Sequence, residues 1–476
     1  MTIEHWLVLI YLLGCIGIGV LASRKVLVSR DEYWVAGRRV GTLVNAMAIM
    51  AALTSGGSII GVMGLAYGRG IPYTLALFAG AVLGFPLASI LVARALRNFG
   101  RFTITDFLVF RFPHKIIRFA VPLIIVVSFT AYIVAQMKAA GITASVLLGI
   151  PYDTAVSIAT IVFILYVSIG GMVAITWTDV IQGILMLSVI LGTASVMMAR
   201  LGSPIKIISQ ATICAPGLGE VVNQPFGSYL GSFVIWVTAI SIIPHVIMRV
   251  LSAKDVKSAR FSLNLAMLIY SAMIIAAVLI IVPVGKMNFP RLEDADTVFL
   301  MVMESEFSPL VRGFAVAAVL AAVMSTTDAL LLACSSAISH DLLGGIIEKK
   351  LEKKVARGIT IAVPWVIGLL AMSFAFSPPA LITEFYSAAI GMLSAALFVP
   401  TIAGLWWKKA NTTGGIASFL VGLGVYLFVQ FAPGTAPLSA ILFALPASFL
   451  AMWLFSKFGR PNTADMMETV FGLHHP

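Results

Sequence analysis

Oxygen-bearing side chains sit in the middle of one of the most apolar stretches of this sequence. Residues 325–328 read Ser-Thr-Thr-Asp inside an apolar segment that runs from about 314 to 338. An ionisable group at membrane depth costs roughly 2.5–3.5 kcal/mol on insertion scales, so it usually marks an ion or substrate path. On a helix, Ala322, Ser325 and Asp328 share one face. Hydroxyl and carboxylate oxygens are the ligands that an alkali cation needs, whereas the simpler interpretation is that the hydroxyls bond back to the preceding turn. The added aspartate favours a functional site.

A second unusual stretch lies at residues 51–58, which read Ala-Ala-Leu-Thr-Ser-Gly-Gly-Ser. Two adjacent glycines flanked by hydroxyl residues make a poor helix interior. In a transporter, a helix broken at the bilayer midplane frees carbonyls for a cation and amides for an anion. Close helix packing through small residues explains the same pattern, and both interpretations stay open.

Three ionisable residues elsewhere in apolar segments have alternative roles. Lys138 could bind a substrate carboxylate or form a gate, pair with an acid on a neighbouring span, or extend to the interface. Asp179 could cap a helix or line a cytoplasmic ion exit. His245 follows Pro244 at a predicted helix break, where a structural role competes with proton transfer.

The composition indicates membrane-spanning helices, and these helices would place the groups described above within the bilayer. The chain has 476 residues, of which 60% are hydrophobic and 11% charged. Only helices satisfy their own backbone hydrogen bonds in lipid, and the period-two alternation of an outer-membrane barrel is lacking. We predict an all-α integral membrane protein with thirteen spans, at about 5–23, 42–67, 71–93, 118–149, 153–175, 178–199, 228–248, 263–284, 311–339, 359–376, 380–404, 413–431 and 436–455.

The distribution of positive charge predicts the topology. The net charge is +11, and most of the 31 basic residues fall in alternate loops, among them Arg24, Lys25, Arg94, Arg97, Lys254, Lys257, Lys349, Lys350, Lys408, Lys409 and Lys457. The positive-inside rule then places the N-terminus outside and the C-terminus in the cytoplasm of a plasma (inner) membrane. The charge therefore indicates membrane orientation and not nucleic acid binding. Residues 5–23 lack a basic segment before them and are followed by Arg24 and Lys25, so we expect a retained span.

The sequence does not suggest an enzyme. It contains no paired nucleophile and base, phosphate-binding loop or metal-ligand cluster, and its three cysteines are scattered. We expect no cofactor and no metal other than a coupling cation. The partners expected are the lipid bilayer and a small organic solute.

Several ordered motifs together resemble the sodium:solute symporter family over nearly the whole chain. They are, in chain order, Asp31–Arg38, Leu148–Asp153, Gly170–Gly171 through Trp177–Asp179 to Gln182–Gly183, Pro244–His245 with Arg249 and Lys254–Asp255, and Ala321–Thr326 with Leu330–Leu331 and Ser335–Ile338. The motifs are similar to those of the pantothenate, proline and monocarboxylate branches.

The resemblance implies a LeuT-type core of two five-helix inverted repeats within one transporter domain, residues 1–476. Repeat one would cover about 42–199 and repeat two about 228–404, with an extra span at 5–23 and accessory spans at about 413–455. It implies a sodium site from the carbonyls of Thr54, Gly57 and Ala322 and the hydroxyls of Ser325 and Thr326. It also implies an ion exit or second sodium site at Asp179, and substrate contacts from Ser55, Gly56, Ser58, Gln136 and Lys138. Asp328 replaces the small polar residue of the family, and with Asp179 it could complete a second cation site or carry a proton.

This sequence departs from the family pattern at residues 55–58, at Asp328, and at residues 241–243 before the Pro-His pair. The resemblance implies a sodium-coupled secondary active symporter, working as a monomer, that imports pantothenate, a monocarboxylate or a proline-like solute by alternating access. Two alternatives stay open: a proton-coupled transporter that uses Asp328 or His245, and a membrane sensor with a transporter fold.

Overall fold

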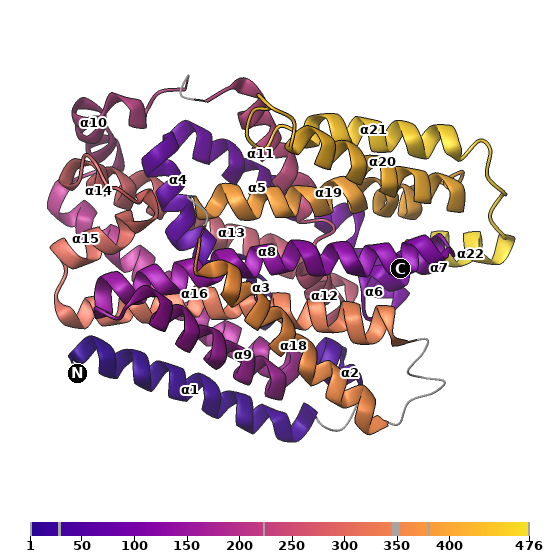
Figure 1. Cartoon of the computed structure of the whole chain (residues 1–476), viewed down its shortest axis with the longest axis horizontal. Coiled ribbons are helices and arrows are strands. Elements are labelled where there is room, and N and C mark those ends of the chain that lie inside the picture. Colours follow the sequence, from indigo (N-terminus) through magenta and orange to yellow (C-terminus); the bar gives the residue numbers. More distant parts are fainter. Residues whose placement is uncertain (1, 27–29, 222–223, 345–352, 379–380, 475–476) are drawn as a thin grey trace.

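The computed structural model is a bundle of helices, most of which run along the long axis of the molecule (Figure 1). It describes residues 2–26, 30–221, 224–344, 353–378 and 381–474. Lys349 and Lys350, two of the basic loop residues, lie outside these ranges. The helices are α1 (Ile3–Val26), α2 (Arg30–Val35), η1 (Ala36–Arg38), α3 (Thr42–Leu53), η2 (Gly57–Gly61), α4 (Val62–Arg69), α5 (Ile71–Leu91), α6 (Ala93–Phe99), α7 (Ile104–Arg111), α8 (Lys115–Leu148), α9 (Tyr152–Leu201), α10 (Pro204–Cys214), η3 (Pro216–Leu218), α11 (Phe226–Ala239), α12 (Pro244–Ser252), α13 (Val256–Ala276), η4 (Ala277–Ile281), α14 (Val282–Asn288), η5 (Ala295–Thr297), α15 (Val298–Glu306), α16 (Pro309–Ser336), η6 (Ala337–Leu342), α18 (Lys353–Ala375), α19 (Ile382–Trp406), α20 (Thr412–Gln430), α21 (Ile441–Phe455) and α22 (Ala464–Gly472).

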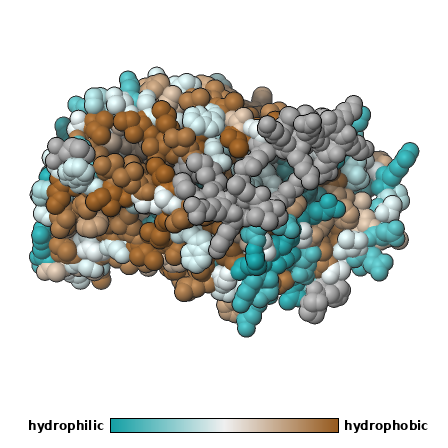
Figure 2. Space-filling model, turned by 90° about the horizontal axis from the view of Figure 1, so that it is seen from below, coloured by the Kyte–Doolittle hydropathy of each residue, from teal (hydrophilic) through white to brown (hydrophobic). Residues whose placement is uncertain are grey.

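The predicted spans coincide with apolar helices. Within the described residues, nine helices are long and apolar enough to cross a membrane, and the pair Thr42–Leu53 and Gly57–Arg69 forms one further bent candidate. Three shorter apolar helices, Ile3–Ile18, Tyr152–Leu165 and Ile441–Phe455, match the other predicted spans. Apolar side chains cover much of the surface, and polar ones gather toward the ends of the long axis (Figure 2). The N-terminus lies at one end with α10 and α15, and α22 lies toward the other end (Figure 1).

The second predicted span is broken, as the paired glycines indicated. Helix α3 ends at Leu53, Thr54 leaves helical geometry with φ −78° and ψ 78°, and the chain resumes in the π-helical turn η2 after a 62° bend. Close packing also holds here, because a Cβ at Gly56 would lie 2.7 Å from Ala139 Cβ and a Cβ at Gly57 would lie 2.3 Å from Tyr386 Cε1. The helix break and the close packing through small residues are therefore both present, and the binding of a cation or an anion at the break stays a prediction.

Two further interruptions lie at positions that the sequence singled out. Gly171 has φ +54° inside α9, where a Cβ would lie 2.8 Å from Tyr33 Cδ2, so this position requires glycine on both grounds. Pro244 begins α12 after α11 has ended at Ala239, so the Pro-His pair marks a real break. A glycine thus interrupts α9, and a proline marks the break in the predicted seventh span.

Helix α16 lies at the centre of the bundle and positions the polar stretch 325–328. It packs against α1, α3, α8, α9 and α18, and its apolar stretch is buried along its whole length. Ser325, Thr326, Thr327 and Asp328 are all fully or almost fully buried. Buried polar groups need hydrogen-bond partners, so the partners of these four residues define the candidate site.

The last helix is fastened to the same end of the bundle as α6 and α7. Arg94 donates to the carbonyl of His474 over 3.1 Å, and Asn98 donates to that of Leu473 over 2.9 Å. The His474 imidazole lies 3.0 Å from the carbonyl of Leu405 at the end of α19. Helix α22 therefore connects α6 to α19.

We expect Gly57→Ala to destabilise the folded protein. Its methyl group would overlap the Tyr386 ring, and overpacking of a core costs about 1–3 kcal/mol. The measurement is the thermal unfolding midpoint of the purified protein. Gly192→Ala is the matched control, since a Cβ there meets nothing within 4 Å. Equal midpoints for the two variants would contradict the packing role of Gly57.

Candidate functional site

The break after α3 leaves two carbonyls without their helical partners. The Ser55 amide donates to Leu53 over 2.9 Å instead of to Ala51, and the Gly56 amide donates to Gln136 Oε1 over 2.9 Å instead of to Ala52. A backbone oxygen at membrane depth needs another donor. The carbonyls of Ala51 and Ala52 are therefore exposed to whatever faces them across the helix interface.

Helix α16 supplies both donors. The Ser325 hydroxyl donates to the Ala51 carbonyl and the Thr326 hydroxyl donates to the Ala52 carbonyl, each over 2.9 Å. Ser325 Oγ is also 3.2 Å from the carbonyl of Ala322, the third residue expected on this face. The polar stretch of α16 thus meets the broken helix directly.

One of the expected sodium ligands has another contact in this structure. The Gly57 carbonyl accepts from Thr383 of α19 over 3.4 Å. The Thr54 side chain also has a contact, since its hydroxyl lies 3.3 Å from Met50 Sδ, although the expected ligand atom was the Thr54 carbonyl. The hydroxyls of Ser325 and Thr326 instead contact the carbonyls of Ala51 and Ala52, which lie three and two residues before Thr54. Sequence reasoning missed Ala51 and Ala52, because the carbonyls that lose their partners depend on where the helix ends.

Four of the five expected substrate-binding residues, Ser55, Gly56, Ser58 and Gln136, lie side by side at the break. Ser58 donates through its amide to Ser55 Oγ over 3.0 Å and through its hydroxyl to the Leu53 carbonyl over 2.9 Å. Gln136 accepts from the Gly56 amide, and its buried Nε2 has no hydrogen-bond partner among the described residues. An amide donor buried at this place is available for a bound solute.

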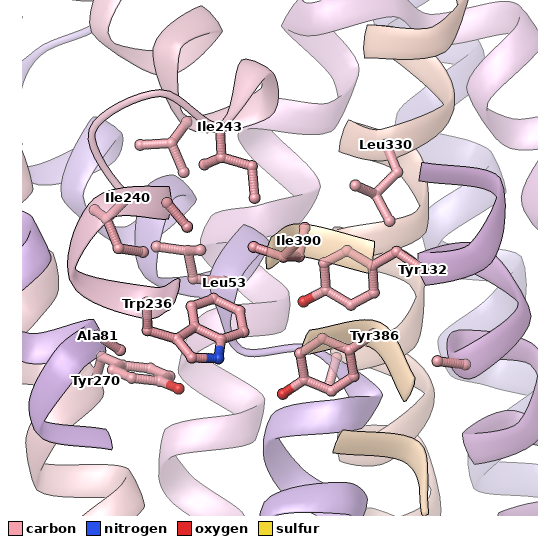
Figure 3. Packing of buried hydrophobic residues seen from close by; sticks show 14 of the residues in the cluster. Leu53, Ala81, Tyr132, Trp236, Ile240, Ile243, Tyr270, Leu330, Tyr386 and Ile390 are labelled. Atoms are coloured by element: carbon pink, nitrogen blue, oxygen red, sulfur yellow. The ribbon is translucent and has the colours of Figure 1, made fainter. Parts of the chain in front are cut away.

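An aromatic group that the sequence analysis did not identify surrounds the same place. Figure 3 shows Tyr132, Trp236, Tyr270 and Tyr386 gathered around Leu53 at the end of α3. Tyr132 and Tyr386 stack with ring centroids 4.7 Å apart, Trp236 meets Tyr386 edge-on at 5.8 Å, and the Tyr270 hydroxyl is 3.5 Å from Ser58 Oγ. Tyrosine and tryptophan offer an apolar face with a polar end. The sequence signal that could have identified these residues was the hydroxyl or ring N–H that each one carries within an otherwise apolar helix.

Asp179 does not cap a helix. The backbone turns at Gly171 and the helix then continues, so Asp179 lies buried inside α9 and forms an ion pair with Arg249 of α12. Arg249 also donates to the Thr176 hydroxyl over 2.7 Å. Asp328 lies within electrostatic reach of both Asp179 and Arg249, and neither of its oxygens has a hydrogen-bond partner among the described residues. The structure therefore brings Asp179 and Asp328 into one buried electrostatic cluster with Arg249, which pairs with Asp179.

Lys138 forms the internal ion pair that was one of its three interpretations. Its ammonium lies 2.8 Å from Asp296 and 3.3 Å from Asp294, both in the segment between α14 and α15. Asp296 also accepts from the Ile382 amide at the start of α19 over 3.1 Å. Asp296 and Lys138 are almost completely buried. This pair holds the loop segment against α8 and α19.

His245 is buried in an apolar environment, and Glu384 near the start of α19 forms an ion pair. The His245 ring packs against Phe129 with centroids 5.5 Å apart, and neither ring nitrogen has a partner among the described residues. Glu384 is partly exposed and pairs with Arg69 over 3.0 Å. At the other end, His340 pairs with Asp106 over 3.1 Å, which ties the end of α16 to α7. The Asp106, His340 and Asp341 ligand atoms lie within 4.8 Å of one another, but this ion pair explains their proximity.

A helical membrane protein with a broken helix, freed carbonyls and facing hydroxyls has the architecture of an ion-coupled secondary transporter. Comparisons with known proteins define the class more closely. A model of the sodium:solute symporter family matches residues 33–422, so the chain belongs to this family.

Two relatives are similar along nearly their whole length. The osmoregulated proline transporter OpuE of Bacillus subtilis (strain 168) is 27% identical over 453 residues, which cover 93% of this chain and 92% of the relative. The sodium/proline symporter of Escherichia coli (strain K12) is 28% identical over 483 residues, which cover 96% and 94%.

Solved structures share the fold. A Na⁺-coupled sialic acid symporter in a substrate-bound outward-open state aligns with a TM-score of 0.81 at 16% identity, covering 97% of this chain and 99% of that chain. A nucleobase-cation-symport-1 family transporter in a closed conformation aligns with a TM-score of 0.57 at 14% identity, covering 94% and 100%. The predicted all-α, LeuT-type architecture is confirmed, whereas the repeat boundaries stay a prediction.

We expect the loop around Asp296 to dock more tightly as the pH falls. Burial raises the pKa of Asp296 to about 6, although attraction to Lys138 acts in the opposite direction. The docked loop therefore binds a proton more tightly than a released loop would, so docking weakens as the pH rises through 6. The measurement is hydrogen exchange of amides 294–298, corrected for the intrinsic rate, which should slow by up to about tenfold in total between pH 7 and 5.

The matched variant is Asp296→Asn, which cannot titrate and whose corrected exchange should not depend on pH in this range. Faster exchange of the wild-type loop at acid pH would mean that the attraction to Lys138 outweighs the cost of burial.

Proposed function

We propose that this protein is a sodium-coupled symporter that imports proline or a similarly small organic solute by alternating access. The observation that carries the proposal is the meeting of the Ser325 and Thr326 hydroxyls with the carbonyls of Ala51 and Ala52 at a helix break. These are neutral oxygen groups, and a hydroxyl can donate to a carbonyl or offer its own lone pairs to a cation. Such a donor set suits Na⁺ better than a transition metal.

In this proposal sodium is a transported ion that links two helices. Ala51 and Ala52 belong to the broken span and Ser325 and Thr326 to α16, so a cation between them would hold α3 and α16 in one arrangement. Thr54, Gly57 and Ala322 remain proposed ligands from the family resemblance. Moving one charge through 100 mV contributes about 2.3 kcal/mol, so one or two sodium ions can drive strong accumulation.

The surroundings of the break favour a solute with an apolar body and a polar end. Tyr132, Trp236 and Tyr386 offer aromatic faces, and Gln136 and the Ser55–Ser58 turn offer polar groups. Lys138 is engaged by two aspartates, which weakens the argument that it selects an organic anion. A proline ring with its carboxylate and amine fits this description, and two relatives carry proline in their names. Pantothenate and monocarboxylates are the next solutes to test.

Release to the cytoplasm would follow the polar path past Asp179. The excess of basic residues in alternate loops supports an outside N-terminus, a cytoplasmic C-terminus and a plasma membrane location. The proposed working unit is the monomer, because the sodium and solute groups all come from one chain. Transport by such a protein needs no catalytic group.

We expect Ser325→Ala/Thr326→Ala to abolish sodium stimulation of uptake. The measurement is uptake of labelled proline, pantothenate and acetate into proteoliposomes with and without an inward sodium gradient. Wild type should accumulate one of them with sodium, and the apparent sodium affinity of each single variant should fall at least about tenfold, because each loses one ligand hydroxyl.

The matched control is Ser336→Ala on the same helix, whose hydroxyl only bonds back to Ala333 over 3.0 Å. It should transport as wild type does. Uptake of all three solutes that ignores sodium in wild type would contradict the proposal.

A second candidate function is proton coupling through Asp328. The supporting observation is that both of its buried oxygens lack hydrogen-bond partners among the described residues, beside an aspartate that already pairs with Arg249. A protonated carboxyl avoids the cost of a second buried negative charge.

Uptake driven by a pH gradient in sodium-free buffer distinguishes the two functions. With sodium coupling, Asp328→Asn should keep at least about half of the sodium-driven uptake, since the amide conserves the size and polarity of a neutral carboxyl. Under proton coupling, wild type should accumulate solute without sodium and Asp328→Asn should not.

A further inference from the structure

A groove between α19 and α21 has no part in the sodium or solute site. It has a volume of about 780 Å³, and its walls include Phe398, Ile402, Ala403, Trp406, Phe449 and Trp453. Phe449 is 63% exposed and Trp453 43% exposed, so the groove opens on the lipid-facing side of the bundle. A lipid tail is the apolar ligand that reaches such a groove from the bilayer.

One end of the groove carries positive charge. Lys409 and Lys457 line it, and no aspartate or glutamate does. Neither lysine forms an ion pair with the part of the chain that the structure describes. Lys457 lies 3.3 Å from the centroid of the Trp453 ring, which holds its ammonium against the groove wall. Two cations that follow the ends of α19 and α21 therefore line the same mouth.

The aromatic residues give the depth of the groove in the membrane. Trp406, Trp407 and Trp453 all lie in its wall close to the two lysines. Tryptophan concentrates at the level of the lipid headgroups, and lysine just beyond it meets phosphate. The charged mouth therefore lies at headgroup height, and the apolar walls extend toward the membrane interior.

We propose that this groove is a binding site for an anionic phospholipid of the cytoplasmic leaflet. The phosphate of the headgroup lies between Lys409 and Lys457, and an acyl chain lies between α19 and α21. Basic pockets between helices on the cytoplasmic side are suited to anionic headgroups. A zwitterionic lipid fills the apolar walls equally well but gains less from the two charges.

Not every lysine at this end of the bundle contributes charge to the groove. Lys408 stands next to Lys409 in the sequence but lies 5.4 Å from the Phe471 ring of α22 and does not line the groove. Charge at this end of the bundle is thus divided between the groove and the last helix. Lys408 and Lys254 together provide a control that removes two positive charges from outside the groove.

The test is native mass spectrometry of the full-length protein in detergent, titrated with phosphatidylglycerol or phosphatidylcholine. Wild type should retain one phosphatidylglycerol more tightly than phosphatidylcholine. Lys409→Gln/Lys457→Gln should weaken phosphatidylglycerol binding about thirtyfold, because each basic residue near an anionic lipid contributes about a factor of five. Lys254→Gln/Lys408→Gln should bind as wild type does.

Two further arms identify the ligand. Ala403→Phe fills the apolar wall without a change of charge and should reduce phosphatidylglycerol retention at least fivefold. Millimolar glycerol phosphate, which has a headgroup but no tail, should not displace the lipid. Equal retention of both lipids by wild type, or unchanged retention in Lys409→Gln/Lys457→Gln, would mean that the groove holds only non-selective boundary lipid and would overturn the proposal.

Discussion

A helix that stops in the middle of a membrane leaves backbone groups that lipid cannot satisfy, and the rest of this core is arranged around that constraint. At the end of α3, the freed amide of Gly56 is taken by Gln136 of α8, and the freed carbonyls of Ala51 and Ala52 are taken by Ser325 and Thr326 of α16. An unsatisfied group there would cost several kcal/mol. The broken helix therefore requires polar residues at these positions of α8 and α16, two helices that are otherwise mostly apolar.

Two buried ion pairs among the described residues join parts of the chain that are distant in sequence. Arg249 connects α12 to α9 through Asp179, and Lys138 connects α8 to the segment before α15 through Asp296. Pairs of this kind are weak contributors to net stability, but loss of one partner is costly. Hydroxyl–carbonyl contacts between α3 and α16 are individually weaker, about 1 kcal/mol each, and can be exchanged for a cation with little loss.

The sequence predicted the helical class, the break at the paired glycines and the hydroxyls at membrane depth, because each leaves a local mark on composition. It could not identify Ala51 and Ala52, since an alanine carbonyl loses its helical partner only through the exact end of a helix. The partner of Lys138 was equally hidden, because Asp296 lies in a loop far along the chain. Tyr132, Tyr270 and Tyr386 were counted as apolar residues, and only their shared location shows that their polar ends converge. The interpretation of Asp179 as a helix cap was wrong because the turn occurs two helical turns earlier, at Gly171.

The attachment of α22 has a consequence for observing movement in this protein. Its last residues are bound to α6 on one side and to α19 on the other, so α22 cannot keep both attachments if these two helices separate. Any such separation would release backbone carbonyls that Arg94 and Asn98 now hold. A fluorescent probe on α22 would then report each separation as a change in its rotational freedom, without any alteration of Ser325, Thr326 or the broken helix.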